Sequence, residues 1–182
     1  MKIMKTLTGI FFTTIFFLSF FSASHAQAQY NSSKNQNRPQ FTYDVSGGVG
    51  SYNGNSYTEI DLGLNWWMKD WLNWRNSVFT QFGSSINSIY GLDSALLFQS
   101  SLYTQGHGAG VEVFAGPGLR FASEDSNGVF GKAGVVFSLG GLRLGGGAQV
   151  THYYDTRKDK NSVKLPDDEV QYFIILSGGG SF

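Results

Sequence analysis

Two histidines beyond residue 30 have side chains that could serve in acid–base or nucleophilic catalysis. His107 lies in the glycine-rich stretch "TQGHGAG", where a polar turn residue is the ordinary interpretation. His152 lies in "THYYD", and a histidine general base needs a hydroxyl or thiol within reach. The neighbouring hydroxyl, Thr151, would point to the opposite face of a strand, and the nearest acids are Asp155 and Glu169. The residues therefore predict no catalytic centre, and His152 is a weak candidate.

A second set of residues is charged and alternates along the chain with apolar residues. Many glycines share the charged face. Inside a narrow barrel the side chains of all strands compete for one axis, so mixed charges and glycines indicate an interior filled by ion pairs. Buried charges without partners would be costly. The predicted interior network is Asp44, Glu59, Asp61, Arg75, Asp93, Glu112, Arg120, Lys132 and Arg143, and Glu169 shares its face.

Other kinds of site are not indicated. Two glycine-rich stretches, "GAGVEVFAG" and "LGGLRLGGG", lie in or between expected strands without a helix to follow, so neither is a phosphate loop. No cluster has metal-ligand spacing, and we predict no cofactor. The formal net charge is +0, which gives no basic bias towards nucleic acid. The stretch "DTRKDKNSVKLPDDE" carries Arg157, Lys158, Lys160 and Lys164, which could bind lipopolysaccharide phosphates or simply be solvated.

The elements that position these residues are strands. From Phe41 onward, polar and apolar residues alternate with period two in eight segments of roughly ten residues, the length that crosses a bilayer when tilted. The apolar face carries bulky residues and no Lys or Arg in the strand centres, as lipid contact requires. The predicted fold is all-β, a closed eight-stranded antiparallel transmembrane barrel. A soluble periplasmic ligand-binding barrel, with its apolar face inward, is an alternative.

Aromatic residues gather near the expected strand ends. Tryptophan and tyrosine favour the membrane–water boundary, so we predict two aromatic girdles. One girdle flanks the "WMKD" turn and consists of Trp66, Trp67, Trp71 and Trp74. The opposite girdle consists of Tyr52, Tyr57, Tyr90, Tyr153, Tyr154 and Tyr172.

The chain divides into three parts. Residues 1–28 have a positive start, an apolar run and small-residue cleavage sites, which predicts a cleaved secretory signal peptide. Residues 29–40 are polar and aperiodic and read as a flexible leader, and residues 41–182 form the barrel. The sequence contains no Cys, so this exported protein has no disulfide and must be held by a large core or a closed ladder.

The alternating last segment, "VQYFIILSGGGSF", ends on Phe182 and resembles the C-terminal signature of bacterial outer-membrane barrels. The region from Phe41 to Phe182 resembles the small eight-stranded barrels of the outer-membrane protein A and X type. This resemblance implies that the outer-membrane assembly machinery recognises the C-terminal strand through Phe182. It also implies location in the outer membrane of a Gram-negative bacterium. The implied partners are outer-membrane lipids, with lipopolysaccharide as a candidate.

A partial resemblance to lipid A deacylase barrels involves His152. Those enzymes carry a His and a Ser two residues apart on one strand, with an acid beyond. Tyr154 stands where the Ser is expected, so the acyl-transfer mechanism has no nucleophile. We therefore predict a structural or surface-interacting barrel that is neither an enzyme nor a wide pore, and a lipid A-modifying enzyme is the first alternative.

Overall fold

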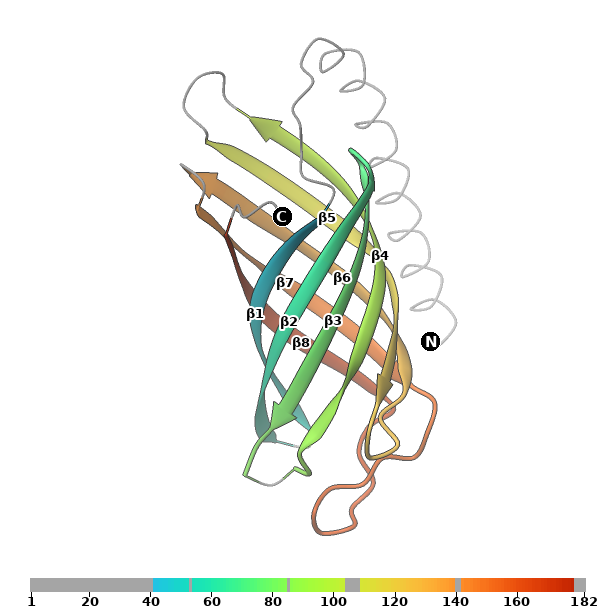
Figure 1. The fold of residues 1–182 in the computed structure, drawn as a ribbon. Helices are drawn as coiled ribbons and strands as arrows, with labels where there is room; N and C mark the ends of the chain where they lie inside the picture. The colour runs from blue at the N-terminus through green and yellow to red at the C-terminus, as the bar shows by residue number, and fades with distance from the viewer. Residues whose placement is uncertain (1–40, 53, 85, 104–108, 140–141, 179–182) are drawn as a thin grey trace, which may run out of the picture. The chain divides into compact units, whose positions relative to one another are not determined.

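The computed structural model describes residues 41–52, 54–84, 86–103, 109–139 and 142–178 (Figure 1). The signal-peptide and leader predictions, His107 and Phe182 lie outside the described residues. Eight strands follow one another along the chain. They are β1 (Phe41–Tyr52), β2 (Asn55–Lys69), β3 (Leu72–Phe82), β4 (Ile89–Tyr103), β5 (Gly110–Ala122), β6 (Gly128–Leu139), β7 (Leu142–Tyr153) and β8 (Asp168–Gly178).

The strands form one closed antiparallel barrel in the order β1 to β8, and the ring in Figure 1 closes where β8 meets β1. The closing pairs run from Val45↔Leu176 to Gly50↔Gln171. Closure leaves no exposed sheet edge along these pairs, which accounts for how a chain without disulfides holds its first and last strands together. The predicted all-β, eight-stranded closed fold is confirmed.

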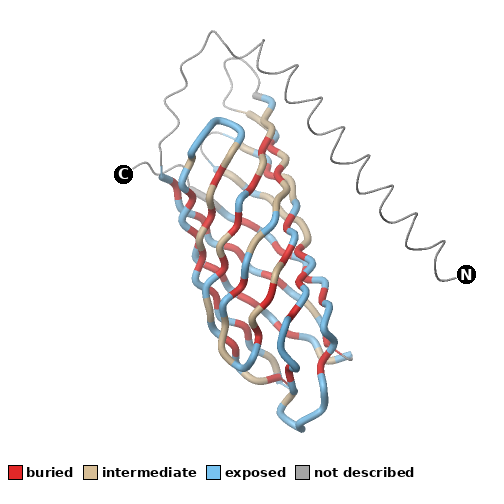
Figure 2. Tube along the Cα trace, turned by 90° about the vertical axis from the view of Figure 1, so that its right-hand side faces the viewer, coloured by how far each residue is buried: buried red, intermediate tan, exposed pale blue. Residues whose placement is uncertain are grey.

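Burial alternates along the strands, as the red and pale blue bands of Figure 2 show. Asp61 is 2% exposed, whereas the adjacent Leu62 is 56% exposed. Every charged member of the predicted network is buried or half-buried, and the large apolar side chains on the other face are exposed. The apolar face therefore points outward and the charged face inward, opposite to a soluble ligand-binding barrel.

An apolar cluster also lies inside the barrel. It contains the residues that interrupt the polar face in the sequence, among them Leu97, Phe114 and Phe173. Its members are Ala95, Leu97, Phe114, Phe130, Val136, Phe173 and Ile175. These side chains come from β4, β5, β6 and β8 and pack across the lumen. The interior thus contains apolar packing beside its ion pairs.

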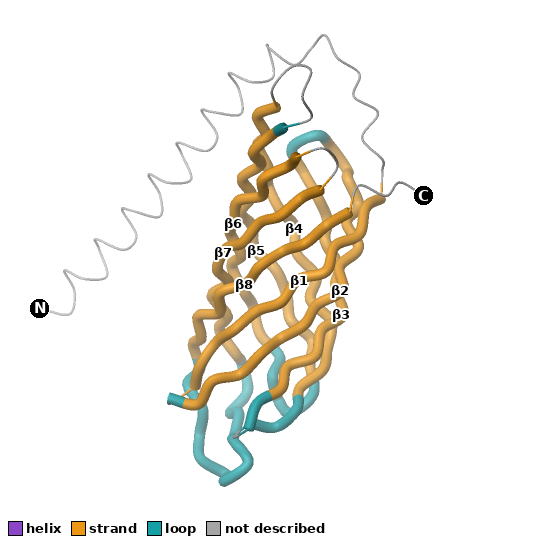
Figure 3. The backbone as a smooth tube through the Cα atoms, turned by 90° about the vertical axis from the view of Figure 1, so that its left-hand side faces the viewer, coloured by secondary structure: helices purple, strands orange, loops and turns teal. Residues whose placement is uncertain are grey.

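The two ends of the barrel differ. At the loop end, named here for its longer connections, lie the connections 83–88, 123–127 and 154–167, drawn in teal at the lower end of Figure 3. The turn end is the opposite end, where residues 70–71 join β2 to β3. None of the described residues forms a helix long and apolar enough to cross a membrane.

Candidate functional site

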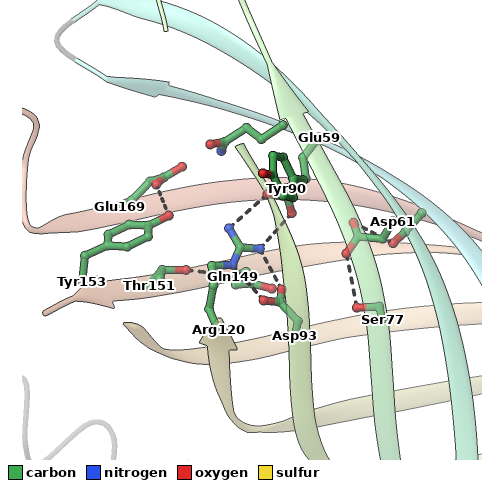
Figure 4. Close-up of polar contacts among 12 residues, drawn as sticks. Glu59, Asp61, Ser77, Tyr90, Asp93, Arg120, Gln149, Thr151, Tyr153 and Glu169 are labelled. Carbon is green, nitrogen blue, oxygen red and sulfur yellow. Dashed lines mark hydrogen bonds and ion pairs between the residues drawn. The ribbon is translucent and has the colours of Figure 1, made fainter. Parts of the chain in front are cut away.

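Arg120, on β5, lies in the barrel between two acidic side chains from other strands. Its Nη1 and Nη2 donate to the Glu59 carboxylate on β2, both at 3.0 Å. Its Nε and Nη2 donate to Asp93 on β4, at 2.8 and 2.7 Å (Figure 4). The guanidinium also stacks on the Phe79 ring, 4.0 Å from its centroid. One cation therefore ties four strands together through charge-assisted and ring contacts.

A second ion pair lies nearer the turn end. Arg75 Nη2 donates to Asp44 Oδ1 at 2.7 Å, and Nε donates to Oδ2 at 3.2 Å. Asn65 donates to the same carboxylate at 2.6 Å. Arg75 Nη1 also donates to Ser77 at 2.9 Å. Since both partners are bidentate and buried, the pair fixes β3 against β1 across the intervening β2.

The remaining interior charges are arranged differently. Arg143 Nη2 donates to Glu112 at 2.7 Å, and Gln99 donates to the same carboxylate oxygen. Asp61 accepts a hydrogen bond from Ser46 at 3.2 Å. The Lys132 ammonium lies 4.4 Å from the centroid of the Phe173 ring, so a ring rather than a single carboxylate is its close partner.

Interior glycines make room for these side chains. A Cβ on Gly63 would lie 2.7 Å from Arg75 Nη2 and 2.8 Å from Asp44 Oδ1. A Cβ on Gly134 would lie 2.6 Å from the tip of the Phe114 ring. All three distances are too short for a real carbon, so the ion pair and the ring occupy the space that the missing side chains leave.

Arg157, in the 154–167 connection, closes the loop end. It is 2% exposed and donates to the Tyr52 hydroxyl at 2.8 Å, the Pro166 carbonyl at 2.8 Å and Glu169 at 3.4 Å. Its guanidinium also lies 3.2 Å from the centroid of the Tyr153 ring. The interpretation of Arg157 as a surface group for lipopolysaccharide phosphates is therefore wrong, because its charge is buried in the barrel mouth.

The girdle predictions need two corrections. Tyr52, Tyr57 and Tyr153 were expected at the membrane boundary, but all three are buried inside the loop end. Tyr52 and Tyr57 stack there, with centroids 4.8 Å apart. Trp67 also faces the lumen, where its Nε1 donates to Thr42 at 3.2 Å. A buried partner or ring at the strand end offsets the preference of these side chains for the boundary.

The other predicted girdle residues lie on the outer wall. Trp66, Trp71, Tyr90, Tyr154 and Tyr172 are exposed, and Trp74 is half-buried. Trp66 packs against Trp74, and the Trp74 Nε1 donates to Ser94 at 2.9 Å. Aromatic side chains therefore face outward at both ends of the barrel.

His152 lies on the outer wall at the loop end of β7. Its Nδ1 is 2.7 Å from Asp168 Oδ1 on β8, so its acidic partner is Asp168 and not the Asp155 or Glu169 that sequence proximity indicated. Tyr154 meets the imidazole edge-on, with centroids 6.5 Å apart. Thr151 is buried on the inner face, as strand alternation predicts. The pair can hold or move a proton at the wall, and among the described residues no Ser or Thr hydroxyl is bonded to it.

Three acidic side chains in the lumen come close together. Glu59, Asp61 and Asp93 have carboxylate oxygens within 4.8 Å of one another. Arg120 already donates to two of these three groups, so the arrangement is an ion-pair centre. We assign no metal to it.

Comparisons with known proteins match this chain to small barrels of known structure at low identity. No family model and no curated protein matches the chain. A designed transmembrane β-barrel has 16% identity and a TM-score of 0.46, covering 76% of this chain and 96% of that chain. The outer membrane enzyme PagL has 17% identity and a TM-score of 0.47, covering 74% and 97%. Neisserial surface protein A has 14% identity and a TM-score of 0.44, covering 75% and 94%. The barrel is structurally similar to these small barrels at low identity.

Proposed function

We propose that this protein is an outer-membrane barrel with a structural or surface-interacting role, and that it is neither a wide pore nor an enzyme. The observation that carries the proposal is the Arg120 centre, in which one cation joins Glu59 and Asp93 across a lumen whose outer wall is apolar. An apolar outer wall matches a lipid environment, and buried ion pairs replace the water that would fill a channel.

Several layers of side chains fill the lumen. Arg157, Tyr52, Tyr57 and the residues packed on them occupy the loop end, and the Arg120 centre lies below them. The cavity bounded by Arg75, Glu112 and Lys132 measures about 40 Å³, which is room for roughly three water molecules. This small volume supports a barrel whose interior is filled and stabilised by its own side chains.

The proposal places the protein in the outer membrane of a Gram-negative bacterium, with lipid as its surroundings and the loop end exposed to the exterior. The expected partners are outer-membrane lipids, with lipopolysaccharide as a candidate, and the assembly machinery acting on the strand that ends at Phe182. The test is membrane fractionation followed by electrophoresis with and without boiling. A membrane-bound protein whose migration changes on boiling supports the barrel, and release by a salt wash contradicts it.

A second candidate function is lipid A modification, favoured by the His152–Asp168 pair on the outer wall. The pair would act as a general base, and the missing hydroxyl nucleophile is the argument against it. Mass spectrometry of lipid A from cells that overproduce the protein or its His152→Ala variant decides between the two. We expect identical lipid A in both. A change that disappears in the variant would favour the enzyme.

A further inference from the structure

We propose that a hollow on the outer wall near the loop end binds one membrane lipid, holding its hydrocarbon chain against the strands and its phosphate at Lys160. This inference rests on the proposed function, since it requires the outer wall to face lipid. The hollow measures about 520 Å³ and spans four neighbouring strands, β8, β1, β2 and β3.

The strand register explains why the wall is hollowed there. Cross-strand pairs place four outward side chains in one row, namely Tyr172, Val49, Thr58 and Phe82. The two outer members are aromatic, and the two inner members are short. The row nearer the rim continues with the paired Ser51 and Ser56. Two rings thus form walls on either side of a low floor.

The floor is two strands wide, and neighbouring strands lie about 4.8 Å apart. The described residues that line the hollow all lie in the loop-end part of these strands or directly after β3. The depression is therefore confined to the part of the wall next to the loop end. Its apolar side walls suit a hydrocarbon chain better than a polar ligand.

The hollow gains polar groups towards the rim, as a lipid does from its hydrocarbon chain to its headgroup. Val49, Phe82 and Tyr172 offer apolar contacts deepest in the wall. The hydroxyls of Ser51 and Ser56 follow towards the rim, at the level where a lipid carries ester or glycerol oxygens. Beyond them Gly83, at the end of the hollow, is followed by the loop connections.

Lys160 supplies the charge at this end. Its Nζ donates to the carbonyls of Ser84 at 3.1 Å and Gly83 at 3.4 Å, so it is held beside a residue that lines the hollow. An ammonium group has three donors, and these two bonds leave one for a phosphate oxygen. The side chain is exposed, as a group that meets a lipid headgroup must be.

The test is native mass spectrometry of the full chain, folded in detergent and mixed with dioleoylphosphatidylglycerol or with dioleoylglycerol, which has the same chains and no phosphate. We expect wild type to retain one phosphatidylglycerol. Val49→Trp fills the floor and should lower the lipid-bound fraction about tenfold. Lys160→Gln should lower retention of phosphatidylglycerol to that of dioleoylglycerol without changing the latter.

Val78→Trp is the matched control, because Val78 on β3 is exposed like Val49 on β1 but lies outside the hollow. It should retain the lipid as wild type does. Thr58→Trp replaces Val49→Trp if the latter does not fold. Equal retention by the hollow-filling and control variants would overturn this inference while the barrel remains heat-modifiable. Loss of heat-modifiable migration in wild type would instead overturn the proposed function.

Discussion

Arg120 is the residue that pairs with two buried carboxylates at once, each 2% exposed or less. Arg120→Leu leaves both Glu59 and Asp93 buried without their cation. Breaking a buried pair in this way costs about 3–5 kcal/mol. We expect a loss of that size in the free energy of unfolding by urea in detergent micelles, followed by tryptophan fluorescence.

Arg143→Leu is the control for this prediction. Its side chain is 20% exposed at the turn end, and its loss leaves one carboxylate, Glu112, to which Gln99 still donates. The loss should be clearly smaller than for Arg120→Leu. Equal losses in the two variants would show that the Arg120 centre contributes no more to the free energy of unfolding than the Arg143–Glu112 pair does.

Alternation alone predicts which charged residues face inward, because the side-chain period of a strand is two. It does not predict partners. Lys132 lies on the Phe173 ring and not beside one acid, and the partner of His152 proved to be Asp168. Arg157 lies in a connection without periodicity, so nothing in its sequence indicates that it folds back into the mouth.

At the scale of the strands, interior glycines set how closely neighbouring elements pack. Gly134, on β6, accommodates the Phe114 ring of β5 and the carbonyl of Gly146 on β7. Gly134→Ala should therefore overpack the lumen and lower stability by about 1–3 kcal/mol in the same urea assay. Gly131→Ala, where a Cβ would meet nothing within 4 Å, is the matched control and should change stability little. A neutral Gly134→Ala would contradict this account of the glycines.

Arg157 holds the 154–167 connection to the barrel, together with Lys160 and the buried Leu165. Removing that side chain in Arg157→Ala deletes its bonds to Tyr52, Glu169 and Pro166. We expect trypsin to cleave the connection of the folded barrel at least several-fold faster, because local opening becomes easier. Lys158→Ala, at an exposed neighbouring position, should not accelerate cleavage at the remaining sites. Unchanged cleavage of Arg157→Ala would mean that other contacts hold this connection.

For the whole molecule, the filled lumen predicts very low permeability. Liposomes that contain the protein should not swell in solutions of a small sugar, because the ion pairs and the loop-end cluster of Tyr52, Tyr57, Ile86 and Leu165 occupy the axis. Arg157→Ala should remain closed, since the Arg120 centre lies farther along the lumen. Rapid swelling with wild type would contradict the proposed role.

The fold could be predicted because polar and apolar residues alternate along the strands and the outward side chains are apolar. The girdle prediction was wrong for Tyr52, Tyr57 and Tyr153 because it followed their place at strand ends and not the alternation of faces. Strand alternation puts Tyr52 on the face of Asp44 and Tyr153 on the face of Thr151, and Arg157 lies against both rings. The position of Arg157 between them depends on tertiary contacts that no local pattern encodes.

The strict neighbour order of the strands has a consequence for how the ring can assemble. Seven of the eight pairings join strands that follow each other in sequence, and the β1–β8 pairing alone joins residues more than one hundred positions apart. Contacts between near neighbours form quickly, whereas distant ones wait for loop closure. A growing sheet can therefore extend hairpin by hairpin, which leaves one slow, all-or-none event in which the curved sheet joins its own ends.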